Sequence, residues 1–201
     1  MKKMNLYIQN QIQQSIQTKQ KIVQDENLLA QIEQVAQKCI QVYKRGGKTL
    51  LAGNGGSAAD AQHIAAEFVS RFYFDRAALT SIALTTDTSI LTAIGNDYGY
   101  ERIFARQLEA NANESDIFIG ISTSGNSKNI IEALKFCKQK GIFSVGLSGL
   151  SGGNMSELCD ICIKVPSNET PRIQESHIVI GHIICAIVEE ALFGKGFECK
   201  V

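Results

Sequence analysis

The sequence predicts an α/β domain built on a parallel sheet with helices on both of its faces. Two observations support this prediction. Short apolar runs of strand length alternate along the chain with longer segments that have helical periodicity. Such alternation is typical of parallel strands joined by helical crossovers, which cover the sheet from both sides. The 201 residues are enough for one domain of this kind with a complete core.

The chain before the sheet is predicted to form two helices within residues 5–45. The second has a clear apolar stripe at helical spacing and ends before Gly46. The first is rich in Gln and has too few large apolar residues to be stable alone. Two arrangements remain open for it, since it can pack on another subunit or over its own domain. Residues 1–46 are therefore N-terminal helices, and residues 47–201 form the α/β core of one domain.

Five short strands are predicted in this core, and each is followed by a loop. The strands are residues 49–52, 80–84, 116–121, 143–147 and 161–165. Beyond the helix that starts near Ser57, helical segments are predicted at residues 87–94, 98–110, 128–140, 155–159 and 170–193. A break at Gly95-Asn96-Asp97 separates the first two of these, and Pro171 suits the first turn of the last one.

The composition argues against several classes of protein. The 20 basic and 20 acidic residues give a net charge of zero, which is not expected of a nucleic-acid coat or a polybasic membrane anchor. No apolar run reaches the ~18 residues of a transmembrane helix, and the N-terminus becomes polar too early for a signal peptide. We therefore expect no nucleic-acid partner, no membrane partner and a cytoplasmic location.

The six cysteines lie mostly within predicted helices and strands, so we expect reduced thiols rather than a disulfide framework. Cys159 and Cys162 form a single Cys-x-x-Cys motif. Without a second pair, this motif is a weak sign of a zinc or redox site.

The most informative stretch is the loop after the first strand, residues 53–56, which we call the glycine loop. Its three glycines allow positive φ and a close approach of the backbone to a ligand. Ser57 is the expected N-cap of the Ala-rich helix that follows, so free N–H groups and the helix dipole meet at the loop. The sequence predicts an anion site here, with His63 and Glu67 on one face of the helix because they are four residues apart.

The glycine loop also fits the dinucleotide pattern Gly-x-Gly-x-x-Ala, which needs an acidic residue about 20 positions further on, at the end of the next strand. Asp75 has nearly this spacing but precedes that strand, and Asp87 follows the strand but is too distant. The Gly-Lys-Ser/Thr of a P-loop is missing. A nucleotide site is therefore disfavoured.

A second loop, residues 122–127, has the sequence Ser-Thr-Ser-Gly-Asn-Ser and is called the serine loop below. It lies between a predicted strand and a helix start, where hydroxyls and backbone N–H groups can both donate to a phosphate. The loop contains no Arg or Lys, so a monophosphate suits it better than a triphosphate. The alternative is an ordinary capped loop with several serines.

The chain has three histidines, and two of them lie on the last predicted helix. Gln174 and His182 share roughly one face of this helix, and this pair can face His63 and Glu67 across a cleft. Two imidazoles, a carboxylate and an amide oxygen suit a divalent metal such as zinc. Alternatively, Glu67 and His182 serve as proton carriers without a metal. His177 lies on another side of the helix and is expected to be structural.

Three motifs together give the chain a family resemblance. They are Gly-Asn-Gly-Gly-Ser-Ala-Ala-Asp-Ala-Gln-His-x-x-x-Glu from residue 53, the serine loop, and Arg-Ile-Gln-Glu-x-His-x-x-x-x-His from residue 172. In this order they resemble the phosphoheptose isomerases, bacterial members of the sugar isomerase (SIS) fold, and the similarity covers nearly the whole chain. The resemblance implies a single SIS domain over residues 1–201. Its expected fold is a five-stranded parallel sheet in a three-layer, flavodoxin-like α/β/α arrangement with extra N-terminal helices.

For function, the resemblance implies conversion of sedoheptulose 7-phosphate to D-glycero-D-manno-heptose 7-phosphate, the first step towards activated heptose for lipopolysaccharide or capsule. It implies one zinc ion per subunit, with His63, Glu67, Gln174 and His182 as ligands and Glu67 and His182 as the acid/base pair. It also implies a homotetramer with active sites between subunits. The residues that match the family's substrate contacts are Asn54, Gly55, Gly56, Ser57, Glu67, Asn96, Asp97, Ser122, Thr123, Ser124, Ser127 and Gln174. Some members have Ala-Asp where this chain has Thr170-Pro171, so a role for that Asp is not carried over.

The implied reaction suits these residues. Aldose–ketose isomerisation removes a proton from one carbon and returns one to its neighbour, which a single carboxylate such as Glu67 can do. A second group, His182 or a metal, must move protons between the two oxygens and stabilise the enediolate. The main rival is a non-catalytic SIS protein that binds a sugar phosphate or a replication-initiation partner. It would need the serine loop but not the Glu67/His182 pair, and this chain has both.

Overall fold

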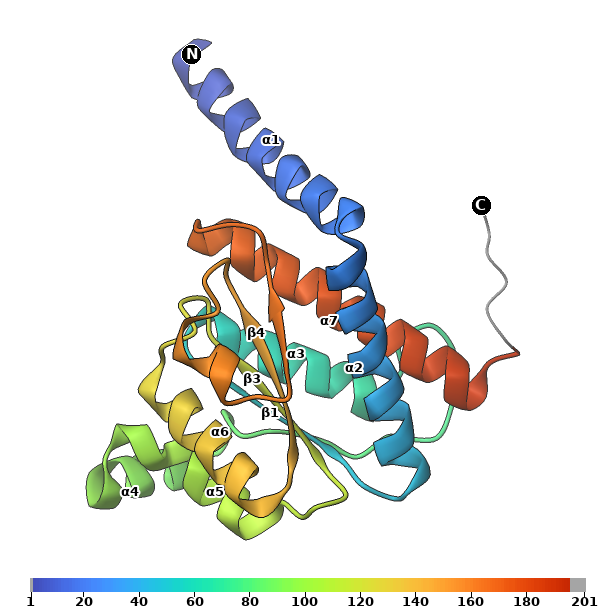
Figure 1. Cartoon of the computed structure of the whole chain (residues 1–201), viewed down its shortest axis with the longest axis vertical. Coiled ribbons are helices and arrows are strands. Elements are labelled where there is room, and N and C mark those ends of the chain that lie inside the picture. Colours follow the sequence, from blue (N-terminus) through green and yellow to red (C-terminus); the bar gives the residue numbers. More distant parts are fainter. Residues whose placement is uncertain (1, 196–201) are drawn as a thin grey trace.

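The computed structural model describes residues 2–195 and confirms the α/β fold with a parallel sheet (Figure 1). Five parallel strands form the sheet in the order β2-β1-β3-β4-β5. Every residue of β1 and β3 is buried, as expected for parallel strands covered on both faces. The strands are β1 Thr49–Gly53, β2 Ser81–Ala83, β3 Ile117–Ile121, β4 Phe143–Ser148 and β5 Ile161–Lys164.

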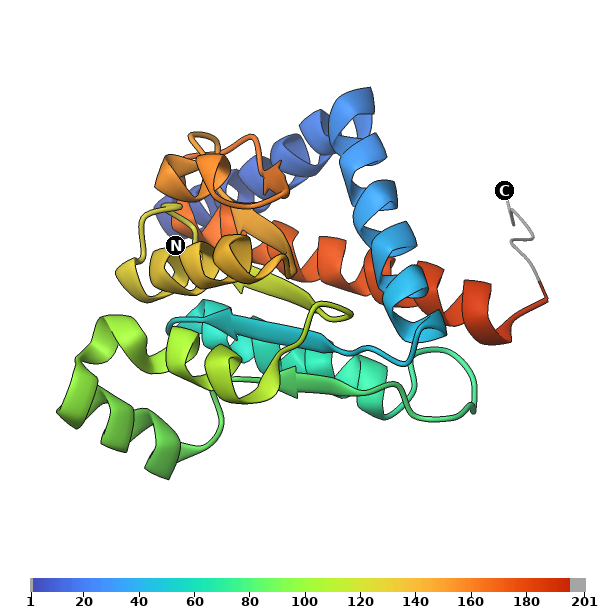
Figure 2. The ribbon, with the colours of Figure 1, turned by 60° about the horizontal axis from the view of Figure 1, so that its bottom comes forward.

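Two layers of helices enclose the sheet (Figures 1 and 2). One apolar core joins a face of the sheet to α2 (Glu26–Lys44), α3 (Gly56–Val69) and α7 (Thr170–Phe193). A second core joins the other face to α5 (Ile103–Asn111) and α6 (Lys128–Lys140). Both views show α4 at the periphery of this second layer, where it packs beside α5.

The strand order places both predicted loops at one point. β1 leads through α3 to its neighbour β2, whereas β3 lies on the other side of β1 and leads through α6 to β4. The carboxyl ends of β1 and β3 therefore flank a topological switch point, where ligands bind in open α/β sheets. The glycine loop follows β1 and the serine loop follows β3, so the two meet at this crevice.

The helix after β2 differs from the prediction. Helix α4 runs from Thr88 to Tyr98 and continues through Gly95-Asn96-Asp97 without a break. It ends at Gly99, whose φ of 89° is open to glycine but costly for other residues. A short 3₁₀ helix, η1 (Tyr100–Arg102), then leads into α5. The predicted helix at residues 155–159 is instead a 3₁₀ helix, η2 (Gly153–Glu157).

Helix α1 (Lys2–Gln24) projects from the body of the molecule and contacts α2 and α7 (Figure 1). Of its apolar side chains, Ile22 near its end is buried. The exposed ones include Met4, Leu6, Tyr7, Ile8, Ile12 and Ile16. Two arrangements were left open for this helix, packing over its own domain or on another subunit. Its own domain covers only part of it, and its N-terminal half presents apolar residues to the outside.

Helix α7 is long and apolar enough to bear on the expectation that the chain has no transmembrane helix. Among the described residues it is the one helix long and apolar enough, by length and composition, to cross a membrane. However, it packs against α2 and α3, and its buried side includes His177 and Glu189. Two of the polar residues that interrupt its apolar sequence, His177 and Glu189, thus lie inside the fold, which is the pattern of a core helix rather than a lipid-facing one.

Candidate active site

Helix α3 begins two residues earlier than predicted. Gly55, with φ of 56°, is the N-cap, and Ser57 lies buried within the first turn, so the assignment of Ser57 as N-cap was wrong. The reason is that Gly55 tolerates the positive φ that starts the turn. No side chain caps this helix start, so its free N–H groups point towards the crevice end of β1.

Asn54 is fixed by a residue that the sequence analysis missed. Its side-chain amide forms a reciprocal pair with Asn129 of α6, at 2.9 Å and 2.8 Å. The hydroxyl of Tyr100, just after Gly99, also donates to the Asn54 oxygen, at 3.2 Å. Asn129 is buried in the first turn of the helix after the serine loop, so the pair locks the two loops to each other.

The serine loop has the features expected of a phosphate site. The hydroxyls of Ser122 and Ser127 lie 2.9 Å apart, and Ser127 is the N-cap of α6 without a side-chain cap bond. Ser124 Oγ accepts from the Asn126 amide at 3.2 Å, and the Thr123 carbonyl accepts from Gly149. Ser127 therefore does not cap the first amides of α6, of which that of Ile130 donates to Asn129 Oδ1 at 3.0 Å, and hydroxyls gather beside this helix start.

His63, Glu67 and His182 converge where α3 and α7 lie side by side. His63 Nε2 is 3.0 Å from Glu67 Oε1 and 3.1 Å from His182 Nε2. One ligand atom from each residue lies within 4.8 Å of the others. The His63 side chain is half-exposed, so the cluster opens to solvent. Two imidazole nitrogens and a carboxylate oxygen are a donor set that suits zinc and also suits proton transfer.

The helices α3 and α7 approach closely because glycines line their contact. A Cβ on Gly181 would lie 2.6 Å from Ile64 Cδ1, and a Cβ on Gly56 would lie 2.6 Å from Gln174 Nε2. Gln174 therefore rests against the first turn of α3, at the glycine-loop end of this contact. The structure thus brings together three of the four predicted metal ligands in one cluster and places the fourth along the same pair of helices.

An ion pair buried behind the cluster was not predicted. Glu189 on α7 accepts from the backbone N–H groups of Phe72 and Tyr73, at 2.8 Å and 2.6 Å, and from Arg76 Nε at 2.9 Å. The guanidinium of Arg76 in turn donates to the carbonyls of Glu67 and Phe68, at 2.9 Å and 2.7 Å. Burial by itself raises the pKa of Glu189, but its three hydrogen bonds outweigh burial and lower it.

This ion pair supports two members of the cluster, Glu67 and His182. It holds the last turn of α3 at Glu67, and through the Phe72 amide it fixes a ring whose centroid is 5.6 Å from that of His182. The only hint in the sequence was a Glu two turns after His182, on roughly the same face of the helix. Its partner Arg76 lies in an irregular loop, where no periodicity points to a contact.

Other predicted residues have different surroundings. Asn96 and Asp97 lie on the exposed side of α4 and are joined by a hydrogen bond of 2.8 Å. His177 is fully buried and its Nε2 lies 3.1 Å from the Ser148 carbonyl, and burial lowers its pKa to about 4, so it is the structural residue that was expected. Asp60, one turn before His63, has a buried carboxylate oxygen without a hydrogen-bond partner, and burial raises its pKa.

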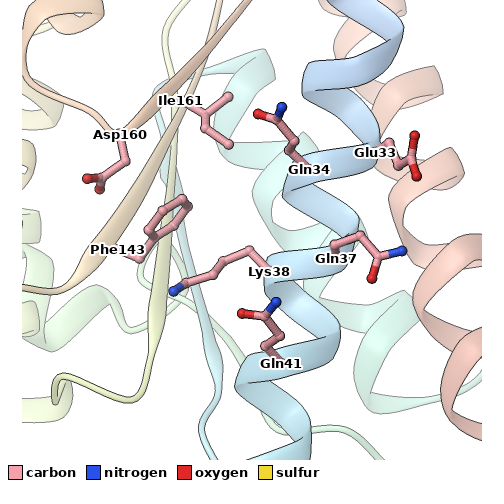
Figure 3. A pocket seen from close by; sticks show the side chains of 8 residues that line it. All are labelled: Glu33, Gln34, Gln37, Lys38, Gln41, Phe143, Asp160 and Ile161. Carbon is pink, nitrogen blue, oxygen red and sulfur yellow. The ribbon is translucent and has the colours of Figure 1, made fainter.

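A separate hollow of about 460 Å³ lies between α2 and the sheet (Figure 3). Its lining includes Phe143 and Ile161, the first residues of β4 and β5, and the Lys38 ammonium lies 4.5 Å from the centre of the Phe143 ring. This hollow is at the amino edge of the sheet. The glycine and serine loops of the candidate active site are at the opposite, carboxyl edge.

Comparison with known proteins agrees with this geometry. A family model described as "SIS domain" matches residues 12–149. The chain is 70% identical over 200 residues to "Phosphoheptose isomerase 2" of Campylobacter jejuni, covering 100% of both chains. It is 72% identical over 194 residues to a phosphoheptose isomerase of Aneurinibacillus thermoaerophilus, covering 96% of this chain and 98% of that one. The solved phosphoheptose isomerase of Neisseria gonorrhoeae superimposes with a TM-score of 0.87 at 39% identity, covering 93% of this chain and 99% of that one. The chain therefore belongs to the phosphoheptose isomerase family of SIS domain proteins.

Proposed function

We propose that the protein is an aldose–ketose isomerase that converts sedoheptulose 7-phosphate to D-glycero-D-manno-heptose 7-phosphate. The observation that supports this most directly is the cluster of Glu67, His63 and His182 between α3 and α7, two to three turns along α3 from the glycine loop. It offers a carboxylate and two imidazoles to a substrate whose phosphate the serine loop can bind. The phosphoheptose isomerases among the relatives support the choice of substrate.

In this mechanism Glu67 is the base. Its carboxylate removes the proton from C1 of the ketose and returns it to C2, since one carboxylate can reach two adjacent carbons. His182 moves the proton between the two oxygens, and its imidazole stabilises the negative charge of the enediolate. The contact of both residues with His63 Nε2, at 3.0 Å and 3.1 Å, holds the acid and the base near one substrate position.

The serine loop supplies binding energy remote from the reacting carbons. The hydroxyls of Ser122, Thr123, Ser124 and Ser127 and the uncapped start of α6 are suitable donors for the 7-phosphate. The helix start at Asn54, Gly55, Gly56 and Ser57 lies across the crevice and suits the hydroxyls of the sugar. Binding at both ends orients the carbonyl relative to Glu67.

Zinc is part of the same proposal. His63, Glu67 and His182, with Gln174 as a fourth ligand, would hold one ion per subunit. When bound, such an ion supplies a Lewis acid that stabilises negative charge on the oxygens of the enediolate. The donor types and their mutual distances within 4.8 Å support the assignment of three of these ligands.

The assembly we propose is a cytoplasmic homotetramer with active sites between subunits, acting as one SIS domain per chain. The exposed apolar residues of α1 support it, because a second copy of the chain would remove them from water. Asn96 and Asp97, exposed on the peripheral helix α4, would then complete a site from a neighbouring subunit. The product would enter the synthesis of activated heptose for lipopolysaccharide or capsule.

The test is incubation of the purified protein with sedoheptulose 7-phosphate and detection of the aldose phosphate. In D₂O, the proposed proton transfer should also place deuterium on C2 of the product. Formation of the aldose by the wild type but not by Glu67→Gln supports the proposal. A wild-type protein that binds the ketose without converting it would instead favour the non-catalytic SIS alternative.

A further inference from the structure

The Cys159–Cys162 motif has no part in the proposed reaction, yet its two thiols lie together. Cys162 pairs in register with Gly146 of the neighbouring strand β4. A Cβ on Gly146 would lie 3.1 Å from Cys159 Sγ and 3.5 Å from Cys162 Sγ. Because this position has no side chain, the two sulfurs border the same small space. The Cys159 thiol donates to the Met155 carbonyl at 3.1 Å.

The surroundings favour a thiolate on one sulfur and a thiol on the other. The neighbouring Cys159 thiol is the largest influence on Cys162 and lowers its pKa to about 7 against the opposing effect of burial. The Ser148 hydroxyl, 3.5 Å away, and the positive charge of Lys164 act in the same direction. The pKa of Cys159 is correspondingly raised, first by the neighbouring Cys162 and then by burial. A thiolate beside a thiol is the reactive form of a cysteine pair.

A small reagent has access to Cys159, the outer sulfur of this pair. Cys159 is partly exposed and lines a surface hollow of about 280 Å³ together with Lys138, Glu157 and Asp160. Zinc fits less well, because within residues 2–195 no third histidine, cysteine or carboxylate atom joins the two sulfurs within 4.8 Å. By contrast, burial raises the pKa of Cys137 to about 12.

The pair also adjoins the segment that supports the serine loop. The Cys159 amide donates to the Met155 carbonyl at 3.1 Å, and the Met155 amide donates to the Gly125 carbonyl at 3.0 Å. The next contact is the Asn154 amide, which donates to Asn126 Oδ1 at 2.9 Å. These hydrogen bonds form a continuous path from Cys159 through η2 to the loop that is proposed to bind phosphate.

We propose that Cys159 and Cys162 form a dithiol site that a hydroperoxide converts to a disulfide, which weakens phosphate binding at the serine loop. The Cys162 thiolate attacks the O–O bond, so a sulfenic acid forms and an alcohol or water leaves. Cys159 then attacks the sulfenic sulfur, the S–S bond forms and water leaves. In total, two thiols lose two electrons and two protons, and the hydroperoxide is reduced. The effect on phosphate binding rests on the proposed function, whereas disulfide formation does not.

The test treats the intact, reduced protein with one equivalent of hydrogen peroxide. Mass spectrometry of the peptide that contains both cysteines should show the loss of two hydrogen atoms, reversed by dithiothreitol. Cys137→Ser, a matched control near the same hollow, should behave as the wild type. Cys159→Ser should give a sulfenic or sulfinic acid on Cys162 instead of the disulfide.

The second measurement compares steady-state kinetics of the fully oxidised and re-reduced wild type. The KM for the phosphorylated ketose should rise by about three- to tenfold on oxidation, as for the loss of one or two hydrogen bonds, while kcat changes less. Oxidation that reaches Cys137 or Cys39 first, or that gives no internal disulfide, would overturn the dithiol site. A complete disulfide with an unchanged KM would overturn the connection to the serine loop.

Discussion

The buried ion pair of Arg76 and Glu189 gives the sharpest test of how the fold positions the active site. Replacing Arg76 by Ala removes the guanidinium that bridges α7, the loop after α3 and the carbonyls of Glu67 and Phe68. The Glu189 carboxylate keeps two backbone N–H partners but loses its counter-charge in a site where its side chain is 1% exposed. The variant therefore leaves a buried charge without compensation.

The expected cost follows from this burial. Removing one partner of a buried ion pair costs about 3–5 kcal/mol, a large share of the ~5–15 kcal/mol that stabilises a typical domain. Activity should fall as well, because the carbonyl of Glu67 loses its anchor. A displacement of the carboxylate on the order of 1 Å is enough to lower kcat by about 10²-fold. Glu189→Gln keeps the shape but should also be costly, because its NH₂ group would face an N–H donor and the buried Arg76 would lose its counter-charge.

The assay combines urea unfolding, which gives the free energy of unfolding, with kinetics on sedoheptulose 7-phosphate. Lys135→Ala is the matched control, because it breaks an exposed ion pair with Glu132 at a similar distance of 2.7 Å. It should change the stability by no more than about 0.5 kcal/mol. If Arg76→Ala unfolds at the same urea concentration as the control and keeps wild-type turnover, the positioning role of the buried pair is refuted.

Glu67→Gln keeps the shape of the side chain but removes the base, so kcat should fall by a factor on the order of 10² or more, and near-normal turnover would remove Glu67 from catalysis. Ser124→Ala should raise the KM of the phosphorylated substrate more than that of an unphosphorylated analogue; an equal rise for both would contradict phosphate binding by the serine loop. Zinc should be stoichiometric by elemental analysis in wild-type protein purified without a His tag and reduced in His63→Ala, and its absence from the wild type after soaking would exclude the metal site. The pKa of Glu189 lies below its ordinary 4.5 in the folded protein, so its stabilisation is fully present above that value and is lost as the pH falls through the folded pKa. Glu189→Gln should therefore show a smaller loss of stability than the wild type when urea unfolding is compared between about pH 6 and pH 3.

The sequence by itself determined the order of the elements and the loops that carry the chemistry. Strands covered on both faces are apolar throughout, so the runs that became β1 and β3 were recognisable, and their parallel arrangement followed from the helices between them. Parallel strands end at one edge, which placed the glycine and serine loops together. The pairing of His63 with Glu67 also followed from sequence, because a spacing of four is a local property of a helix.

Local rules failed where a glycine changed the backbone. Helix α4 continued through Gly95-Asn96-Asp97, since a glycine within a helix costs only about 1 kcal/mol and does not end it, and the chain turned instead at Gly99. Likewise, Gly55 took the N-cap position expected for Ser57. In both places the φ angle that the tertiary arrangement requires decided the outcome, and residue type alone does not reveal it.

Only the tertiary structure decided which distant residues meet. His63 and His182 are 119 positions apart, and Arg76 and Glu189 are 113 apart. Both contacts depend on the close approach of α3 and α7, which in turn depends on the missing side chain of Gly181 against Ile64. A helical face is visible in sequence because its period is local. Packing between elements decides which helix that face contacts. It also decides where the buried ion pair of Arg76 and Glu189 lies, so both became known only from the fold.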